Sequence, residues 1–110
     1  MPAKDHESTT AADPLAVRAA LAREFTCIVS ARGLTQREVA ELLGTTQPKV
    51  SALLSGKVEG FSLDRIVRYL NLLGEDIHIV VLPKPESREQ AQTSVINHVL
   101  DVAEAGLAHA

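Results

Sequence analysis

The strongest constraint on the fold is the way in which glycines divide the chain into short helical runs. Apolar residues recur at spacings of three and four within each run, which is the pattern of an amphipathic helix. The runs end at Gly33, Gly44, Gly56 and Gly74, and glycine is the residue type that most often closes a helix. Between residues 13 and 74 the sequence therefore predicts four short helices, so that the chain is mainly α.

Most of these runs also begin with residues that favour a helix start. Asp13 and Pro14 provide an N-cap followed by a proline in the first turn. Thr35 and Glu38 have the spacing of a capping box, in which each side chain accepts a hydrogen bond from the backbone amide of the other residue. Ser62 is the corresponding cap of the fourth run.

The third run contains Pro48, which a helix tolerates only in its first turn. This helix is therefore expected to start at Thr46 or Gln47. Its core-facing residues are Val50, Leu53 and Leu54. An exposed start that carries Gln47 and Lys49 is suited to contacting base edges and phosphates, so we expect it to face DNA.

After the helices the pattern changes to that of a strand. Residues 76–82, DIHIVVL, are rich in β-branched residues and are followed by Pro83. A single strand in a helical chain has no ladder partner, and unpaired strand edges favour association. We predict that this strand pairs with its copy in a second subunit through Ile77, Ile79 and Val81, or with a partner protein. The alternative is an extended segment without a ladder.

The remaining segments complete the expected domain organisation. Residues 1–12 are polar and without periodicity, which predicts a disordered N-terminal tail. Residues 13–74 form the helical domain, and residues 75–83 the dimerisation strand. Residues 84–110 contain an apolar stripe on an acidic background, which predicts a C-terminal amphipathic helix and tail. Self-association, partner binding and disorder are the three roles considered for this last segment.

Composition limits the function classes. The chain of 110 residues allows one small domain, and its net charge of −3 is unevenly distributed. Residues 30–70 carry six basic and four acidic side chains, whereas residues 71–110 carry two basic and six acidic ones. This split is compatible with a DNA-binding domain that carries an acidic appendage.

Other features of the sequence concern location and chemistry. Cys27 is the only cysteine, so an internal disulfide is excluded, and no apolar segment is long enough for a membrane span or a signal peptide. We expect a cytoplasmic protein without membrane contact. The motifs of hydrolases and phosphate-binding loops are absent from the sequence, so we expect no enzyme activity, no cofactor and no metal.

Residues 34–56, LTQREVAELLGTTQPKVSALLSG, resemble the helix-turn-helix of the Cro/phage-repressor (XRE) family. The matching positions are Leu34, Thr35, Gln36, Ala40, Gly44, Gln47, Val50, Leu53 and Gly56. The resemblance implies a lambda-repressor-like bundle of four to five short helices, followed here by the C-terminal strand and the amphipathic helix.

The resemblance also implies roles for single residues. Base-contacting positions of the family correspond to Thr46, Gln47, Lys49 and Ala52, with Gln47 placed for a bidentate contact to adenine. At Ala52 only a methyl contact is possible, and Pro48 replaces a polar residue, so that part of the readout can depend on DNA shape. Phosphate-contacting positions correspond to Gln36, Arg37 and Lys57.

Residues 61–82 resemble, less specifically, the end of HigA-type antitoxins and related small regulators. This resemblance implies a homodimer that represses its own operon. The expected function is therefore sequence-specific binding of double-stranded DNA by a repressor that recognises a near-palindromic operator. The alternative is an antitoxin that neutralises a RelE/HigB-type ribonuclease toxin and autorepresses its operon; solitary regulators share the same C-terminal pattern. Arg65 and Arg68 fit the solvent-exposed face of the fourth helix better than phosphate contacts.

Overall fold

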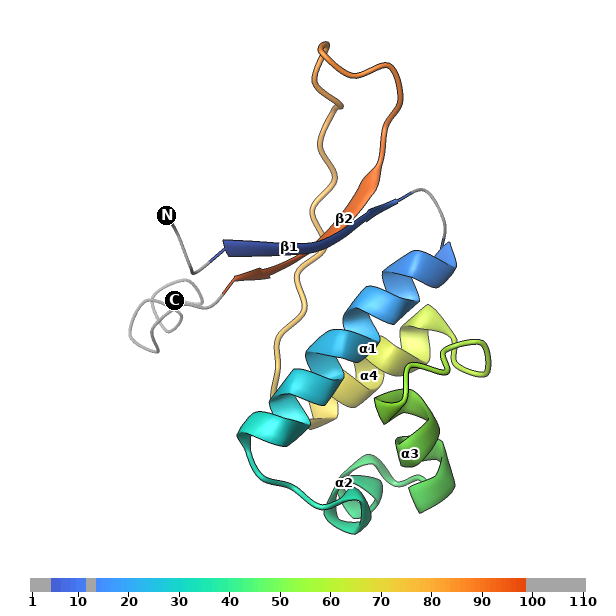
Figure 1. The fold of residues 1–110 in the computed structure, drawn as a ribbon. Coiled ribbons are helices and arrows are strands. Elements are labelled where there is room, and N and C mark those ends of the chain that lie inside the picture. Colours follow the sequence, from blue (N-terminus) through green and yellow to red (C-terminus); the bar gives the residue numbers. More distant parts are fainter. Residues whose placement is uncertain (1–4, 12–13, 99–110) are drawn as a thin grey trace.

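A computed structural model describes residues 5–11 and 14–98, and it confirms the four helices (Figure 1). They are α1 (Pro14–Ala31), α2 (Gln36–Leu43), α3 (Gln47–Leu54) and α4 (Leu63–Leu72). The long helix α1 runs alongside α4, and α2 and α3 lie together at one end of this pair. The fold is thus mainly helical, with the helix-turn-helix at one end.

A single apolar core joins the four helices. Its largest fully buried side chains come from every helix: Phe25, Val39, Val50, Leu53, Ile66 and Leu70. All three aromatic residues of the chain take part, because the ring of Tyr69 lies 6.4 Å from that of Phe25 and 6.3 Å from that of Phe61 between centroids. Tyr69 therefore connects α1 to the loop that precedes α4.

The spacing of Val17, Leu21, Phe25 and Ile28 predicts that these residues form the buried face of α1, and the structure differs from this prediction. Phe25 is fully buried, but its buried neighbours are Ala22 and Val29, whereas Leu21 and Ile28 are only half-buried. The reason is that α1 contacts α3 and α4 on one side and a β-ribbon on another, so apolar side chains surround it. In α2, similarly, Leu42 is 51% exposed although its spacing suggested a core position.

Two arginines of α1 and its C-terminal turn hold distant segments in place. The guanidinium of Arg18 donates a hydrogen bond of 2.9 Å to the carbonyl of Phe61, which fixes the loop between α3 and α4. Arg32 donates to the carbonyl of Leu73 and forms an ion pair of 2.6 Å with Glu75. These contacts tie both ends of α4 to α1.

Two segments expected to be a disordered tail and a helix form strands instead. Strand β1 (Asp5–Ala11) lies within residues 1–12, and β2 (Thr93–His98) within residues 84–110. They pair antiparallel from Asp5 opposite His98 to Ala11 opposite Thr93, with a shift in register between Glu7 and Thr9. The prediction of helix is therefore wrong for β2, and residues 99–110 lie outside the described part of the chain. The ribbon packs against α1.

Residues 76–82 are not part of either strand, so the strand predicted there has no ladder within the described residues. Ile77 is half-buried against the core. The four apolar residues after His78, which are Ile79, Val80, Val81 and Leu82, are 73–90% exposed. Pairing of this segment with a second subunit stays a prediction. Within residues 5–11 and 14–98, no helix combines the length and the apolar character that a membrane span requires.

Candidate nucleic-acid interface

The turn between α2 and α3 depends on Gly44. This residue has φ +66° and ψ +36°, the left-handed conformation that L-residues with a Cβ rarely adopt. Its amide donates to the carbonyl of Glu41, and the next amide, that of Thr45, donates to Ala40 at 3.0 Å. These bonds close α2 and reverse the chain, so that α3 begins after only three residues.

Gly44→Ala is expected to lower the free energy of unfolding by about 1–2 kcal/mol, the cost of a left-handed L-residue. A Cβ built at Gly44 meets no atom within 4 Å, so this cost comes from the backbone conformation alone. Gly60→Ala is the matched control, because Gly60 also has free space around its Cβ position but no positive φ. Urea denaturation of both variants checks this; equal stabilities would contradict it.

The two helices of this motif turn their apolar faces into the core. Buried positions are Val39, Ala40 and Leu43 in α2 and Val50 and Leu53 in α3. The capping box predicted for α2 is present, since the Glu38 amide donates to the Thr35 hydroxyl at 3.1 Å and the Thr35 amide donates to the Glu38 carboxylate at 2.8 Å. The polar faces of α2 and α3 are therefore left to the solvent.

The start of α3 has few free backbone donors. Thr46 is its N-cap, and its hydroxyl accepts a hydrogen bond of 3.4 Å from the amide of Lys49. Pro48 has no N–H, and the amide of Val50 already donates to the carbonyl of Thr46. Of the four amides that a helix start leaves without an intrahelical partner, those of Thr46 and Gln47 have no hydrogen bond in the described structure. Contacts from this end to a ligand therefore depend largely on side chains.

The four predicted base-contacting residues divide into two groups. Thr46, Gln47 and Lys49 are exposed and lie together at the start of α3. Ala52, one turn further on, is half-buried and packs against the core, so it presents only part of its methyl group. The structure therefore brings three polar side chains to the exposed end of the helix and leaves a small apolar surface behind them.

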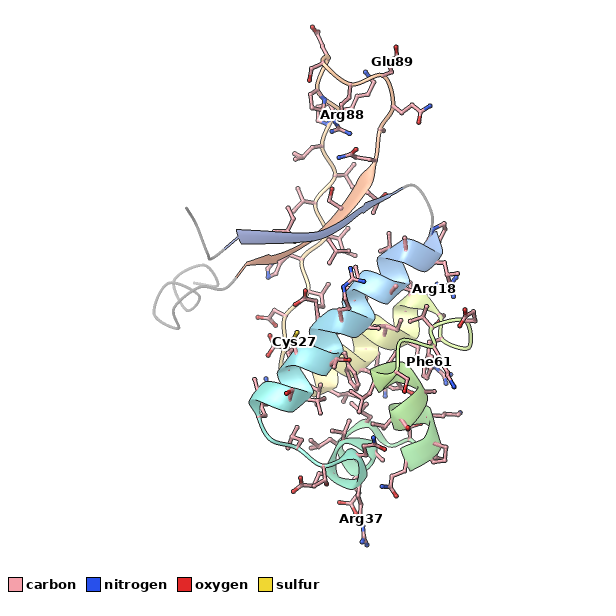
Figure 2. All side chains as sticks on the ribbon, in the orientation of Figure 1. Arg18, Cys27, Arg37, Phe61, Arg88 and Glu89 are labelled. Atoms are coloured by element: carbon pink, nitrogen blue, oxygen red, sulfur yellow. The ribbon has the colours of Figure 1, made fainter. Side chains whose placement is uncertain are left out.

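The predicted phosphate-contacting residues are also exposed. Gln36 and Arg37 start α2, whereas Lys57 follows the C-terminal end of α3. Figure 2 shows Arg37 at the end of the molecule opposite to Arg88, with its side chain directed away from the helices. All three side chains are therefore open to the solvent, but they come from different ends of the two helices.

The basic side chains of the described residues fall into two sets. One set has contacts within the chain: Arg18, Arg23, Arg32, Lys84 and Arg88. The other set has no side-chain hydrogen bond or ion pair in the described structure: Arg37, Lys49, Lys57, Arg65 and Arg68. Every member of the second set lies on α2, α3, α4 or the loop between α3 and α4. Within the described residues, the basic side chains without partners are thus concentrated around the helix-turn-helix.

Arg65 and Arg68 were not among the predicted site residues. They line an open hollow of about 460 Å³ between α4 and the start of α3, together with Thr45 and Lys49. Their spacing of three on α4, opposite buried Ile66, Tyr69 and Leu70, was visible in the sequence. What the sequence alone does not show is that this face of α4 adjoins Lys49.

Comparison with known proteins agrees with this architecture. The model of a helix-turn-helix domain family matches residues 4–82. A solved structure named "Putative XRE Family Transcriptional Regulator" is 40% identical in sequence and superposes with a TM-score of 0.73, over 76% of this chain and 94% of that one. No curated protein matches the chain significantly. Since the family model covers more than half of the chain and the solved relative is matched over nearly its whole length, the protein belongs to the XRE family of helix-turn-helix proteins.

Proposed function

We propose that this protein is a sequence-specific regulator of transcription that binds double-stranded DNA and inserts the start of α3 into the major groove. The observation that carries this proposal is the exposed polar start of α3, surrounded by basic side chains without partners in the described structure. The amide of a glutamine such as Gln47 can contact adenine bidentately, and the ammonium of Lys49 can contact a guanine or a phosphate. The family membership supports the same function.

We further propose that the protein binds as a homodimer and represses by occupying its operator. One small motif contacts only a short half-site, so a dimer recognises two half-sites about 10–10.5 bp apart or a multiple of this distance. The exposed apolar run from Ile79 to Leu82 is an unpaired segment of the kind that associates with a second chain. Antiparallel pairing of two copies would relate the two recognition helices by a two-fold axis, as a near-palindromic operator requires.

The test of the DNA-binding proposal is the substitution Gln47→Ala, with the DNA upstream of the gene as the specific duplex and a scrambled duplex for comparison. The wild-type protein is expected to prefer the upstream duplex. Removing the bidentate contact is expected to lower this preference by about 1–3 kcal/mol, while binding to the scrambled duplex stays unchanged. Fluorescence anisotropy at several salt concentrations measures both affinities.

Gln92→Ala is the matched control, because Gln92 is also exposed and lies before β2, away from α3. It is expected to bind both duplexes like the wild type. A Gln47→Ala protein that keeps the full preference would exclude Gln47 as a base contact. Failure of the wild-type protein to bind either duplex at low salt would refute the DNA-binding proposal itself.

A second candidate function is that of an antitoxin of the HigA type. The observation that favours it is again the exposed apolar run from Ile79 to Leu82, which offers an unpaired backbone edge to another protein as well as to a second copy. A gene for a ribonuclease toxin next to this one, and a stable complex of the two purified proteins, would support this function. If the purified wild-type protein forms a homodimer but no detectable complex with the toxin, this result would argue against the antitoxin function.

A further inference from the structure

We propose that Arg65 and Arg68 of α4, together with Lys49 of α3, form a second contact with DNA, which binds the phosphodiester backbone of one strand beside the major groove. This inference rests on the proposed DNA-binding function and extends the interface from the helix-turn-helix to α4. In the following, these three residues are called the α4 patch.

The three side chains have no partners within the described structure. The side chains of the α4 patch line one open hollow of about 460 Å³, and none of them forms an ion pair or a side-chain hydrogen bond within the described structure. By contrast, Arg18 and Arg32 are both held by hydrogen bonds to backbone carbonyls. Three cations around one hollow repel each other, and an anion placed among them relieves this repulsion.

Arg65 also lies next to the recognition helix. A smaller hollow of about 280 Å³ is lined by Lys49 and Arg65 together with Pro48, Ala52 and Phe61. Lys49 and Ala52 are two of the residues of α3 that we assign to the bases. Arg65 therefore lies at the junction between this part of α3 and the outer face of α4. A duplex that accepts α3 in its major groove brings the phosphates bordering that groove over Arg65.

The side chains of the α4 patch also match the chemistry of a phosphodiester. Guanidinium groups bind phosphate oxygens bidentately, and Lys49 adds a point charge beside them. Asp64 also lines the larger hollow and carries the opposite charge, so it weakens the patch. With three cations and one carboxylate the hollow keeps a net positive charge, which suits the repeated single charges of a DNA strand.

The test is a salt titration of binding to the scrambled duplex and to the upstream duplex by Arg65→Gln and Arg68→Gln. Each lost phosphate contact is expected to reduce the slope of log K against log salt by about 0.9. When the salt concentration is lowered from about 200 to 50 mM, the affinity of each variant then rises by a factor about 3.5-fold smaller than that of the wild type. This reduction is the same for both duplexes. Asp64→Asn is expected to bind both duplexes more tightly than the wild type at low salt.

Arg88→Gln is the matched control, since it removes the same charge at the opposite end of the molecule from α2 (Figure 2). Arg88→Gln is expected to leave the slope of log K against log salt unchanged. Arg65→Lys keeps the positive charge and is expected to retain the wild-type slope. Thermal melting of Arg65→Gln and Arg68→Gln should be the same as that of the wild type, because both side chains are exposed and without partners in the described structure.

Two results would overturn the inference while the proposed function stands. The first is that Arg65→Gln and Arg68→Gln both keep the wild-type slope of log K against log salt, while Gln47→Ala still loses the preference for the upstream duplex. The other is an equal loss in Arg88→Gln, which would show an effect of net charge alone. If the wild-type protein binds neither duplex, the proposed function fails and this inference fails with it.

Discussion

A proline at position 80 or 81 is expected to convert the protein into a monomer and to weaken binding to the upstream DNA by about 10²- to 10⁴-fold, the usual gain from joining two binding units. Proline has no N–H and interrupts a β-ladder. Every second amide of a strand points towards a given neighbour, so one of Val80→Pro and Val81→Pro must remove a bond to the second chain. Sedimentation velocity and DNA titration of both variants measure the two effects.

The fold of the monomer is expected to survive these substitutions, because neither amide is hydrogen-bonded within the described structure and both side chains are exposed. Ser87→Pro is the control, as it places a proline in the exposed turn beyond this segment. It should remain a dimer with wild-type affinity for DNA. If Val80→Pro and Val81→Pro both remain dimeric, the dimer forms through another surface of the protein.

Phe25→Ala is expected to lower the free energy of unfolding by about 3–5 kcal/mol. Phe25 is fully buried at the centre of the core, and its ring also contacts Tyr69. Because small domains have a total stability of about 5–15 kcal/mol, this loss leaves a substantial part of the protein unfolded under mild stress. Urea denaturation followed by circular dichroism measures it.

Leu72→Ala is the comparison, because Leu72 is an apolar residue of α4 that is 42% exposed. Its truncation is expected to change the stability by less than about 1 kcal/mol. If the two substitutions had similar effects, the assignment of Phe25 to the centre of the core would be wrong.

The helices of the motif could be predicted from the sequence because their ends are determined locally. The side chains of Thr35 and Ser62 bond amides three residues on in the chain, and Gly44 closes a helix through its own backbone conformation. Such signals need no knowledge of the rest of the fold. The same holds for the exposed start of α3, where Pro48 fixes the first turn.

The β-ribbon could not be predicted in the same way. Residues 5–11 pair with residues 93–98, which are more than 80 positions away in the sequence. Taken locally, the first segment is polar and favours disorder, and the second has the spacing of a helix. Pairing between the two segments overrides both local preferences. The buried side of α1 was misjudged for a related reason, since contacts from the ribbon are added to those from the helices. The position of Arg65 beside Lys49 likewise depends on tertiary packing.

The scarcity of backbone donors at the start of α3 has a consequence for how such a protein can change during evolution. Since Pro48 and the Thr46 cap remove two of the four amides that a helix start leaves free, the affinity and choice of target at this end rest largely on exposed side chains such as Gln47 and Lys49. Exposed side chains can be exchanged with little effect on folding stability. A lineage of such proteins can therefore move to new target sequences through single substitutions, each of which leaves the helix and its supporting core intact.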